Sequence, residues 1–317
     1  MNWASLGTAK INEKLAPLVN SLNEHKFIGV SSRTEANSKK QSQHLKLEKA
    51  YSSYEAALKD PNVDIIYNSL PNSLHAEWTL KALEAGKHVL CEKPLAMGSR
   101  DVEKIINLSQ KNNLTVMEGL MYRHHGQMDF LKSLLKDIGP IHTLKMSFHT
   151  ILPAGENIRW SKDLGGGALW DLGCYVIHCL RTLMASEPTK LIGRAQFKNE
   201  VDEFFWGQLE FPCGAQAFFD IGFNNVRRET LEIIGQNAVV LVAHPIKATQ
   251  HEEIQILKGR QDIEHRVFEH TEDPYKAQLL NFIESIKKQS TPKITLHDSL
   301  SNTHCLEQLA SAVSQSL

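Results

Sequence analysis

The 317-residue chain lacks several features that mark broad classes of protein. It has no run of about 18 apolar residues, so no membrane-spanning helix is expected. Its amino terminus has no basic segment followed by a long apolar one, so the sequence predicts no signal peptide. Lysine and arginine number 35 against 36 acidic residues, without a long run of either sign. Neither a nucleic acid nor a membrane is therefore the expected partner.

Cysteine is scarce and scattered. The chain has five cysteines, an odd number, and none belongs to a Cys-x-x-Cys pair. Secreted disulfide frameworks and structural zinc sites both need more regular spacing. The pattern predicts a reduced, cytoplasmic protein without a metal site. The cysteines are Cys91, Cys174, Cys179, Cys213 and Cys305.

The first 121 residues alternate short apolar runs with helical periodicity. Strands are expected at 3–6, 27–31, 63–68, 88–91 and 114–118. Helices are expected at 11–22, 54–58, 75–84 and 99–110. Strands separated by helices of about ten residues predict a Rossmann domain, with a doubly wound parallel sheet.

A glycine turn follows the first expected strand. The carboxyl end of a strand, a tight turn and a helix amino terminus form the usual pyrophosphate site of a dinucleotide-binding unit. Gly7, Thr8, Ala9 and Ile11 are the candidate cofactor-binding residues here. The G-x-G-x-x-G fingerprint has glycine where this chain has Ala9 and Asn12, so this turn alone is equally consistent with an ordinary connection.

The second expected strand ends in Ser32 and Arg33. An acidic residue at this place binds the ribose 2′-hydroxyl of NAD, whereas arginine accommodates the 2′-phosphate of NADP. The planar guanidinium matches phosphate oxygens well. The sequence therefore predicts NADP in preference to NAD, with Lys39 and Lys40 as candidate helpers of Arg33. The alternative is that Arg33 is an ordinary polar residue after a strand.

The strand at 88–91 ends in Glu92-Lys93-Pro94. Loops beyond the carboxyl ends of parallel strands are where ligands bind. Proline restricts the preceding residue to extended geometry, so Lys93 is not expected to continue into a helix. We therefore predict that Lys93 takes part in chemistry. The alternative is a solvent-facing loop lysine.

Residues 122–317 are expected to form a second domain, for substrate binding and oligomerisation. After a crossing helix at 122–135, consecutive strands predict a large, mainly antiparallel open sheet. Phe204, Trp206, Phe218 and Phe219 are expected on an open face that packs on a partner sheet. The strands are expected at 141–150, 190–198, 203–211, 215–223, 229–234, 239–242, 253–257 and 264–268, and closing helices at 274–288 and 299–314.

A glycine-rich segment, 165–167, precedes an apolar helical run that carries three ionisable side chains. The three glycines are expected to leave the main chain free to approach a ligand closely. Asp171, Tyr175 and His178 are spaced i, i+4 and i+7, which places them on one face of a helix. Ionisable groups are costly against a plain apolar core, so this face is predicted to line a polar crevice. The alternative is a core tyrosine and histidine with satisfied hydrogen bonds, and an aspartate that caps the helix.

Several motifs, in their order along the chain, resemble the glucose–fructose oxidoreductase / inositol dehydrogenase (Gfo/Idh/MocA) family. The nearest branch holds dimeric dihydrodiol dehydrogenases, NADP-dependent xylose dehydrogenases and glucose–fructose oxidoreductase. The resemblance covers nearly the whole chain. The motifs are Gly7-Thr8-Ala9-Lys10-Ile11, Leu70-Pro71-Asn72 with His75, Glu92-Lys93-Pro94-Leu95 and Met117-Glu118-Gly119-Leu120-Met121-Tyr122-Arg123.

This resemblance implies further site residues. Asp171 and Tyr175 match the aspartate and the His-or-Tyr of the family motif, while His178 stands where relatives often have an acid or amide that contacts substrate. The family also implies a homodimer formed through the carboxyl-terminal sheet. The remaining residues expected to bind the cofactor are Leu70, Asn72, His75, Glu92, Lys93 and Arg123.

The implied reaction is hydride transfer between nicotinamide C4 and a CH–OH or C=O carbon of a sugar, polyol or dihydrodiol. Tyr175 is expected to exchange the proton, with Lys93 beside it and Asp171 as orienting group. Two alternatives stay open. One is a nucleotide-binding sensor or scaffold, because Ala9, Asn12 and His178 depart from the family pattern. The other is a reductase of a different unsaturated substrate, such as a bilin or an imine.

Overall fold

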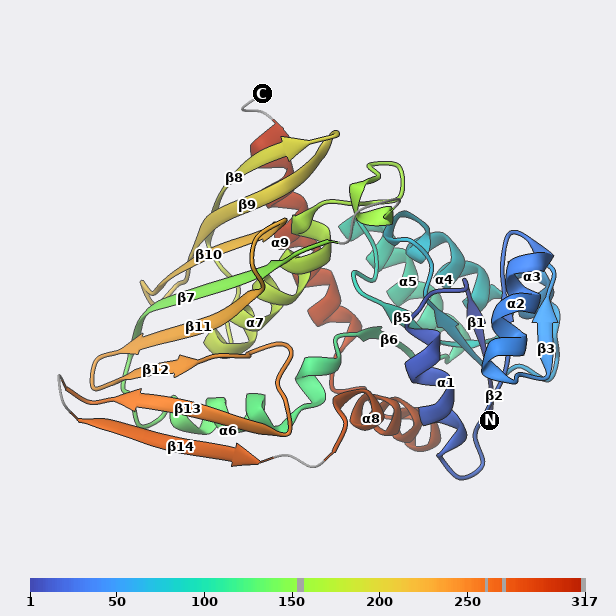
Figure 1. Ribbon diagram of the computed structural model, residues 1–317, viewed down its shortest axis with the longest axis horizontal. Coiled ribbons are helices and arrows are strands. Elements are labelled where there is room, and N and C mark those ends of the chain that lie inside the picture. Colours follow the sequence, from blue (N-terminus) through green and yellow to red (C-terminus); the bar gives the residue numbers. More distant parts are fainter. Residues whose placement is uncertain (153–156, 260–261, 270–271, 315–317) are drawn as a thin grey trace. The chain divides into compact units, whose positions relative to one another are not determined.

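The computed structural model describes residues 1–152, 157–259, 262–269 and 272–314 (Figure 1). The chain divides into two compact units, Met1–Met121 with Tyr275–Leu300, and Tyr122–Pro274 with Ser301–Leu317. The expected second domain includes Tyr275–Leu300, but these residues pack with the first unit. One reason is that the ring of Phe282 lies edge-on against that of Trp3, with 5.8 Å between the centroids.

The sheet of the first unit has six parallel strands in the order β3-β2-β1-β4-β5-β6. The Rossmann prediction is confirmed. Two elements were not expected, β3 and the helix α2 (Glu35–Leu45), because β3 is short and α2 has too few apolar residues to show a helical period. The strands are β1 Asn2–Leu6, β2 Lys26–Ser31, β3 Lys49–Tyr51, β4 Ile65–Asn68, β5 His88–Glu92 and β6 Val116–Gly119.

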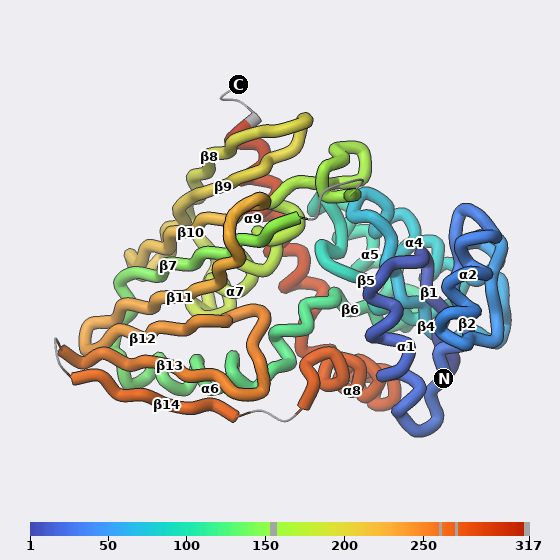
Figure 2. Tube along the Cα trace, viewed as in Figure 1, coloured from blue at the N-terminus to red at the C-terminus, as the bar shows by residue number. Residues whose placement is uncertain are grey.

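Helices cover both faces of this sheet. On one face, Ala4 and Leu6 of β1 join a core with apolar residues of α3, α4 and α5. Trp3 points to the other face because side chains alternate along a strand, and there it meets α8, which runs beside α1 (Figure 2). The helices are α1 Asn12–Asn20, α3 Tyr54–Lys59, α4 His75–Glu84, α5 Ser99–Asn112 and α8 Pro274–Lys288.

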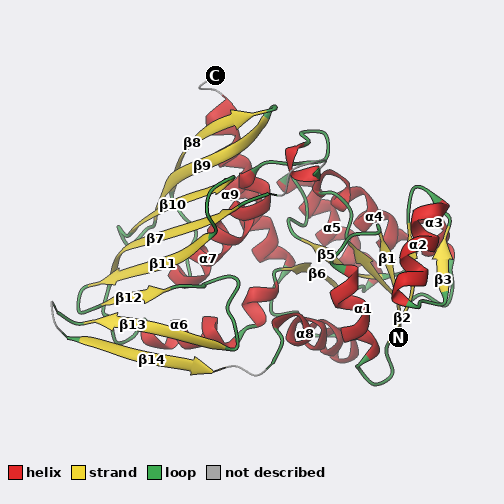
Figure 3. Ribbon diagram, viewed as in Figure 1, coloured by secondary structure: helices red, strands yellow, loops and turns green. Residues whose placement is uncertain are grey.

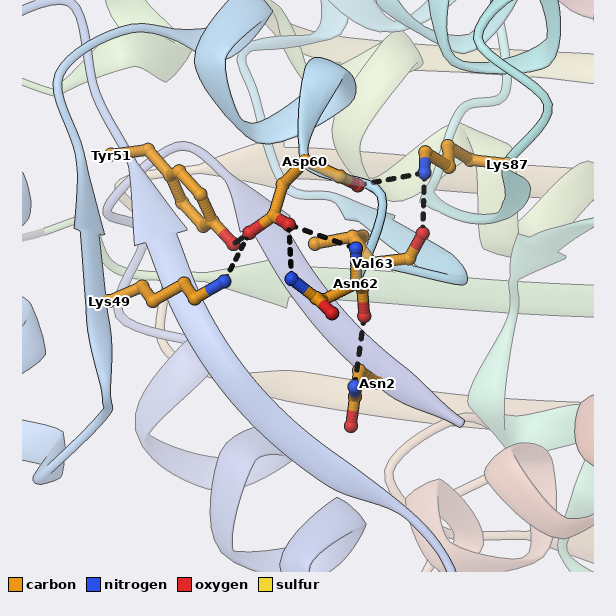
Figure 4. A network of polar contacts seen from close by, with 7 residues as sticks. All are labelled: Asn2, Lys49, Tyr51, Asp60, Asn62, Val63 and Lys87. Carbon is orange, nitrogen blue, oxygen red and sulfur yellow. Dashed lines mark hydrogen bonds and ion pairs between the residues drawn. The ribbon is translucent and has the colours of Figure 1, made fainter.

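A charged network closes the amino-terminal edge of the first sheet (Figure 4). The carboxylate of Asp60 accepts hydrogen bonds from Lys49 Nζ at 2.5 Å and from the Tyr51 hydroxyl at 2.7 Å. The buried Lys87 donates to the carbonyls of Asp60 and Val63, at 2.9 and 2.6 Å. These contacts hold the turn before β4, on the edge opposite the expected ligand site.

The second unit is built on an eight-stranded sheet in the order β14-β13-β12-β11-β7-β10-β9-β8. Among the pairings that the described residues form within this second sheet, only β7 with β10 is parallel, so the prediction of a mainly antiparallel sheet is confirmed. The strands are β7 Ile141–Thr150, β8 Lys190–Lys198, β9 Val201–Glu210, β10 Gln216–Phe223, β11 Arg228–Gly235, β12 Val239–Val242, β13 His251–Leu257 and β14 Ile263–Glu269.

Helices α6 (Gly126–Leu134), α7 (Cys174–Met184) and the last part of α9 (Leu296–Ser314) cover one face of this sheet (Figure 3). Trp206 and Phe218 point to the other face and are 41% and 42% exposed. The expectation that Phe219 shares that face is wrong. Phe219 is 3% exposed and stacks on the buried Phe205, because neighbouring residues of a strand point to opposite faces.

Candidate functional site

In the first unit, the predicted cofactor residues follow the carboxyl ends of neighbouring strands. Gly7 follows β1, Ser32 and Arg33 follow β2, Leu70 follows β4, and Lys93 follows β5. All of these ends lie on one edge because the strands are parallel. β1 and β4 are adjacent although they are distant in sequence, which makes their carboxyl ends the switch point where dinucleotides bind in such sheets.

The Gly7 turn requires glycine. Its φ angle is +93°, and a Cβ atom there would lie 3.2 Å from both the Ser69 carbonyl oxygen and Leu70 Cδ2. The Gly7 amide donates to the Ser31 carbonyl at 3.1 Å. The main chain of the turn therefore packs tightly between β2 and the loop after β4. An absent Cβ also leaves room for a phosphate to approach this main chain.

Asn12, which replaces a glycine of the fingerprint, supports the turn. Its fully buried amide donates to the Gly7 carbonyl and to Gln41 Oε1, both at 2.9 Å, and its oxygen accepts from Ser5 Oγ at 3.1 Å. Gln41 in turn donates to the Ala9 carbonyl at 3.1 Å. The departure from glycine thus has a structural function that sequence reasoning missed. The presence of a polar residue at a glycine position of the fingerprint could have indicated this supporting role.

Arg33 lies at the surface and Ser32 is buried. Ser32 Oγ accepts a hydrogen bond from the Thr34 amide at 3.4 Å, just before α2 begins. Burial raises the pKa of Tyr54, and the positive charge of Arg33 opposes that effect, so the two side chains are neighbours. Lys39 pairs with Glu35 at 2.7 Å. Arg33 is therefore an exposed cation that follows β2, whereas the ammonium group of Lys39 is held by a carboxylate.

His75 joins the two turns that follow β4 and β5. Its ring is 1% exposed, with Nδ1 2.7 Å from the Pro94 carbonyl oxygen and Nε2 2.7 Å from the Leu70 carbonyl oxygen. Burial lowers the pKa of His75, and the two carbonyl contacts oppose that shift. The geometry places His75 as a support for the loop of Lys93. The Lys93–Pro94 peptide bond is cis.

Two glutamates support the same loop. Glu92 Oε1 accepts from the Tyr67 hydroxyl at 2.5 Å. The buried Glu118, in β6, accepts from the Leu95 amide at 3.0 Å and from Ser299 Oγ at 2.6 Å. Asn72, another predicted cofactor residue, begins a short 3₁₀ helix before α4. The sequence named Glu92 but not the support from Glu118.

In the second unit, Asp202 fixes the start of the helical segment that carries the predicted residues. Asp202 Oδ2 accepts from the Leu169 amide at 2.6 Å, and burial raises the pKa of Asp202 to about 7. Gly167 has a φ of +108°, and a Cβ there would collide with the Asp202 carboxylate. Gly167 thus lets β9 approach the helix, which is a packing role, and the expected approach of the glycine-rich segment to a ligand stays a prediction.

Asp171 lies in a π-helical turn, Leu169–Gly173, that precedes α7. Its carboxylate accepts from Arg159 Nε at 2.6 Å and raises the pKa of that guanidinium. π-Helical turns often occur at functional sites because the added residue changes where a side chain points. Arg159 was missed by sequence reasoning because its loop has no periodic pattern.

Tyr175 and His178 both contact Tyr122. The Tyr175 ring is 6% exposed and lies 6.2 Å from the ring centroids of Tyr122 and Phe148. His178 is fully buried, with Nδ1 2.5 Å from the Tyr122 hydroxyl oxygen. The structure therefore places His178 as the buried partner of Tyr122, as in the alternative of a satisfied core histidine.

Arg123 provides a test of whether the protein suits an anionic cofactor. It is 7% exposed, and its Nε and Nη1 atoms have no hydrogen-bond partner among the described residues. Buried guanidinium groups are normally paired. A bound phosphate or amide would satisfy these donors, so Arg123 fits the predicted role in cofactor binding, as does the tight main chain at Gly7.

Comparison with known proteins identifies the class. Residues 1–120 match the family described as "Oxidoreductase family, NAD-binding Rossmann fold" and residues 131–241 match the "GFO/IDH/MocA C-terminal domain". The chain is 30% identical to a D-xylose 1-dehydrogenase (NADP(+)) of Haloferax volcanii over 95% of its length and 94% of the relative's. The chain therefore belongs to the GFO/IDH/MocA oxidoreductases, as the motifs indicated, and is a nicotinamide-dependent oxidoreductase.

Two further similarities are informative. A trans-1,2-dihydrobenzene-1,2-diol dehydrogenase of Xenopus laevis is 32% identical, over 68% of this chain and 67% of that protein. A crystal structure of a 3-ketoreductase from Actinomadura kijaniata, in complex with NADP and TDP-benzene, superposes with a TM-score of 0.93 at 23% identity, over 99% of this chain and 98% of the other. The second similarity shows the shared fold.

The described residues contain neither a membrane-spanning helix nor a metal cluster. None of their helices is both long and apolar enough to cross a membrane. Over the same residues, histidine, cysteine, aspartate and glutamate side chains form no cluster of three or more that could hold a metal ion.

Proposed function

We propose that this oxidoreductase uses NADP(H) in preference to NAD(H), and acts on a CH–OH or C=O carbon of a sugar, polyol or dihydrodiol. The observation that carries the cofactor preference is Arg33, which is exposed directly after β2, where an acidic residue would favour NAD. The names of the xylose and dihydrodiol dehydrogenase relatives support the substrate class.

The cofactor is assigned to residues at the strand ends. The main chain at Gly7, Thr8, Ala9 and Ile11 would hold the pyrophosphate, and Ser32 with Arg33 the 2′-phosphate. His75 acts by holding the Leu70 and Pro94 turns in place. The bound nicotinamide supplies C4 as hydride donor or acceptor. The other residues assigned to the cofactor are Leu70, Asn72, Glu92, Lys93 and Arg123.

The proton chemistry is assigned to Tyr175 and Lys93. Tyr175 gives a proton to the substrate oxygen in reduction and takes it in oxidation, and Lys93 stabilises charge on that oxygen. Asp171, held by Arg159, orients the polar end of the substrate. His178 acts through its contact with the Tyr122 hydroxyl, and the direct substrate contact expected for it stays a prediction.

We also propose a homodimer formed through the open face of the β7–β14 sheet, and a cytoplasmic location. Trp206 and Phe218 leave apolar rings exposed on that face, and such surfaces usually mark association. The location is supported by Cys91, Cys174, Cys179, Cys213 and Cys305, which are all free thiols.

Cofactor titration tests the proposal most directly. Purified protein is titrated with NADPH and with NADH, followed by nicotinamide fluorescence, in the native chain and in Arg33→Ala. We expect tighter binding of NADPH, and a loss of about tenfold in its affinity in the variant, with NADH unchanged. Lys59→Ala, which removes an exposed lysine at the end of α3, is the control for the loss of a surface cation outside the expected phosphate site. Equal affinities in all proteins would contradict the NADP preference.

A substrate panel follows from cofactor binding. Aldoses, inositols and vicinal diols are offered with NADP⁺, and the matching carbonyl compounds with NADPH. Turnover within this set is the expected result. Turnover restricted to imines or bilins, with none in the set, would contradict the proposed substrate class while leaving the cofactor assignment intact.

A further inference from the structure

A lysine that sequence reasoning did not single out lies over the ring of Tyr175. Lys247 Nζ is 5.3 Å from the ring centroid, within the range of a cation–π interaction. Lys247 belongs to the connection between β12 and β13, far along the chain from α7. Both residues belong to the second unit.

A buried carboxylate fixes the position of Lys247. Glu229 is 5% exposed, and its Oε1 atom accepts hydrogen bonds from the main-chain amides of Ile246 and Lys247, the latter at 2.6 Å. Burial raises the pKa of Glu229, while these amide bonds and the charge of Lys247 oppose that shift. The main chain of Lys247 is therefore held by the interior of the unit, unlike that of an ordinary loop lysine.

Three other described side chains near Tyr175 are neutral or paired. Tyr122 and Phe148 present aromatic rings, and Tyr122 is bonded to His178. Arg159 lies close enough to Tyr175 for their charges to interact, but it is paired with Asp171. Lys247 thus places a positive charge over the face of the ring. A cation there stabilises the phenolate more than the phenol, because an opposite charge favours the ionised form.

We propose that Lys247 is a positioning residue that lowers the proton affinity of Tyr175, and that Glu229 holds it in place for this purpose. The significance for catalysis rests on the proposed proton transfer by Tyr175. The electrostatic effect of Lys247 on Tyr175 does not depend on that proposed function, because it concerns two side chains of the same unit. Lys247 would help Tyr175 to release its proton during reduction and to remain poised to accept one during oxidation.

A spectroscopic titration tests the effect without turnover. Tyrosinate absorbance is measured against pH in the native protein and in its Tyr175→Phe variant, and the difference reports Tyr175 alone. The same titrations are made of Lys247→Gln and of the double variant that also carries Tyr175→Phe. We expect the ionisation midpoint of Tyr175 to rise by about one pH unit without the ammonium. Lys247→Arg, which keeps the charge, should leave it near the native value.

Two further variants exclude a structural explanation. Lys258→Gln removes an exposed lysine after β13 that pairs with Glu264, and should leave the midpoint unchanged. Lys247→Met keeps the length of the side chain without its charge and should raise the midpoint in the same direction, so it also serves if Lys247→Gln does not fold. An unchanged midpoint in Lys247→Gln or Lys247→Met, or an equal shift in Lys258→Gln, would overturn the proposal.

The pH profile of turnover supplies a second readout. In Lys247→Gln the basic limb of the profile should move upward by the same amount as the midpoint, while the affinity for NADPH stays constant. A uniform loss of activity at every pH would contradict the proposal. Absence of turnover with every sugar, polyol and diol would count against the proposed function only, since the spectroscopic result stands on its own.

Discussion

The two units support their candidate functional residues by different means. In the first, buried polar side chains hold main-chain turns. Asn12 binds the Gly7 carbonyl, and His75 lies between two carbonyl oxygens. In the second, buried carboxylates also hold main-chain amides, but the candidate side chains themselves are paired with other side chains, as in the Asp171–Arg159 pair and the Tyr122–His178 contact.

This difference predicts different sensitivities. A turn that presents main-chain groups to a ligand tolerates a change of surface side chain, but depends on the few buried residues that shape it. A site made of paired side chains depends on the charge and protonation of each member. Substitution of the buried residues that shape the turns of the first unit should therefore act on cofactor affinity and stability. Substitution of the paired side chains of the second unit should act on turnover and its pH dependence.

The largest effect is expected at Tyr175. Tyr175→Phe removes the proposed proton donor and should lower turnover by about 10²–10⁴-fold, while NADPH affinity stays near the native value. Steady-state kinetics and fluorescence titration measure the two quantities. Tyr275→Phe, at the start of α8, is the matched control and should retain turnover. Unchanged turnover in Tyr175→Phe would show that Tyr175 is not the proton donor. It would also contradict the expectation that the paired side chains of the second unit control turnover.

The charged network at the opposite edge of the first sheet should affect stability and not binding. Asp60→Asn weakens the contacts to Lys49 and Tyr51 and should lower the free energy of unfolding by about 2 kcal/mol at neutral pH. Lys49 holds the pKa of Asp60 well below its usual range. The native protein should therefore lose its advantage over the variant as pH falls below about 4.

Denaturant unfolding at several pH values measures this difference. Asp101→Asn, which removes an exposed partner of Lys104, is the control and should change stability little. A difference between Asp60→Asn and the native protein that is the same at every pH would show that the charge of Asp60 is not the cause.

A smaller effect is expected at Asn12. Asn12→Ala leaves the buried Gly7 carbonyl and Gln41 without their amide partner, and should cost about 1–2 kcal/mol of stability together with several-fold weaker NADPH binding. Asn37→Ala, at an exposed position in α2, serves as the comparison. Native affinity in Asn12→Ala would mean that the turn keeps its shape without this support.

The smallest effect is a pH dependence in the second unit. Burial raises the pKa of Asp202 to about 7, above its unfolded value near 4, so the folded state binds the extra proton. Stability from this group is therefore present at low pH and is lost as pH rises towards and through about 7. The native protein should gain about 1 kcal/mol between about pH 7.5 and about pH 6 relative to Asp202→Asn. Denaturant unfolding at several pH values measures the difference. If the free energy of unfolding depends on pH in the same way in both proteins, the charge of Asp202 is not the cause.

Local patterns predicted much of the fold. The bounds expected for β7, β8, α4 and α8 agree with the structure, because apolar periodicity and turn residues are properties of adjacent residues. β3 and α2 lack such a period and were not predicted. The sequence also named Lys93, Asp171 and Tyr175, because each belongs to a short recognisable motif.

The sequence by itself determined the class of the protein, the alternation of strands and helices, and the residue types at the strand ends. Only the tertiary structure decided which residues meet. It joined Asn12 to Gln41, Asp171 to Arg159 and Lys247 to Tyr175. These partners are separated in sequence and belong to different elements, so their contacts depend on how the sheets and helices pack, which no local pattern encodes.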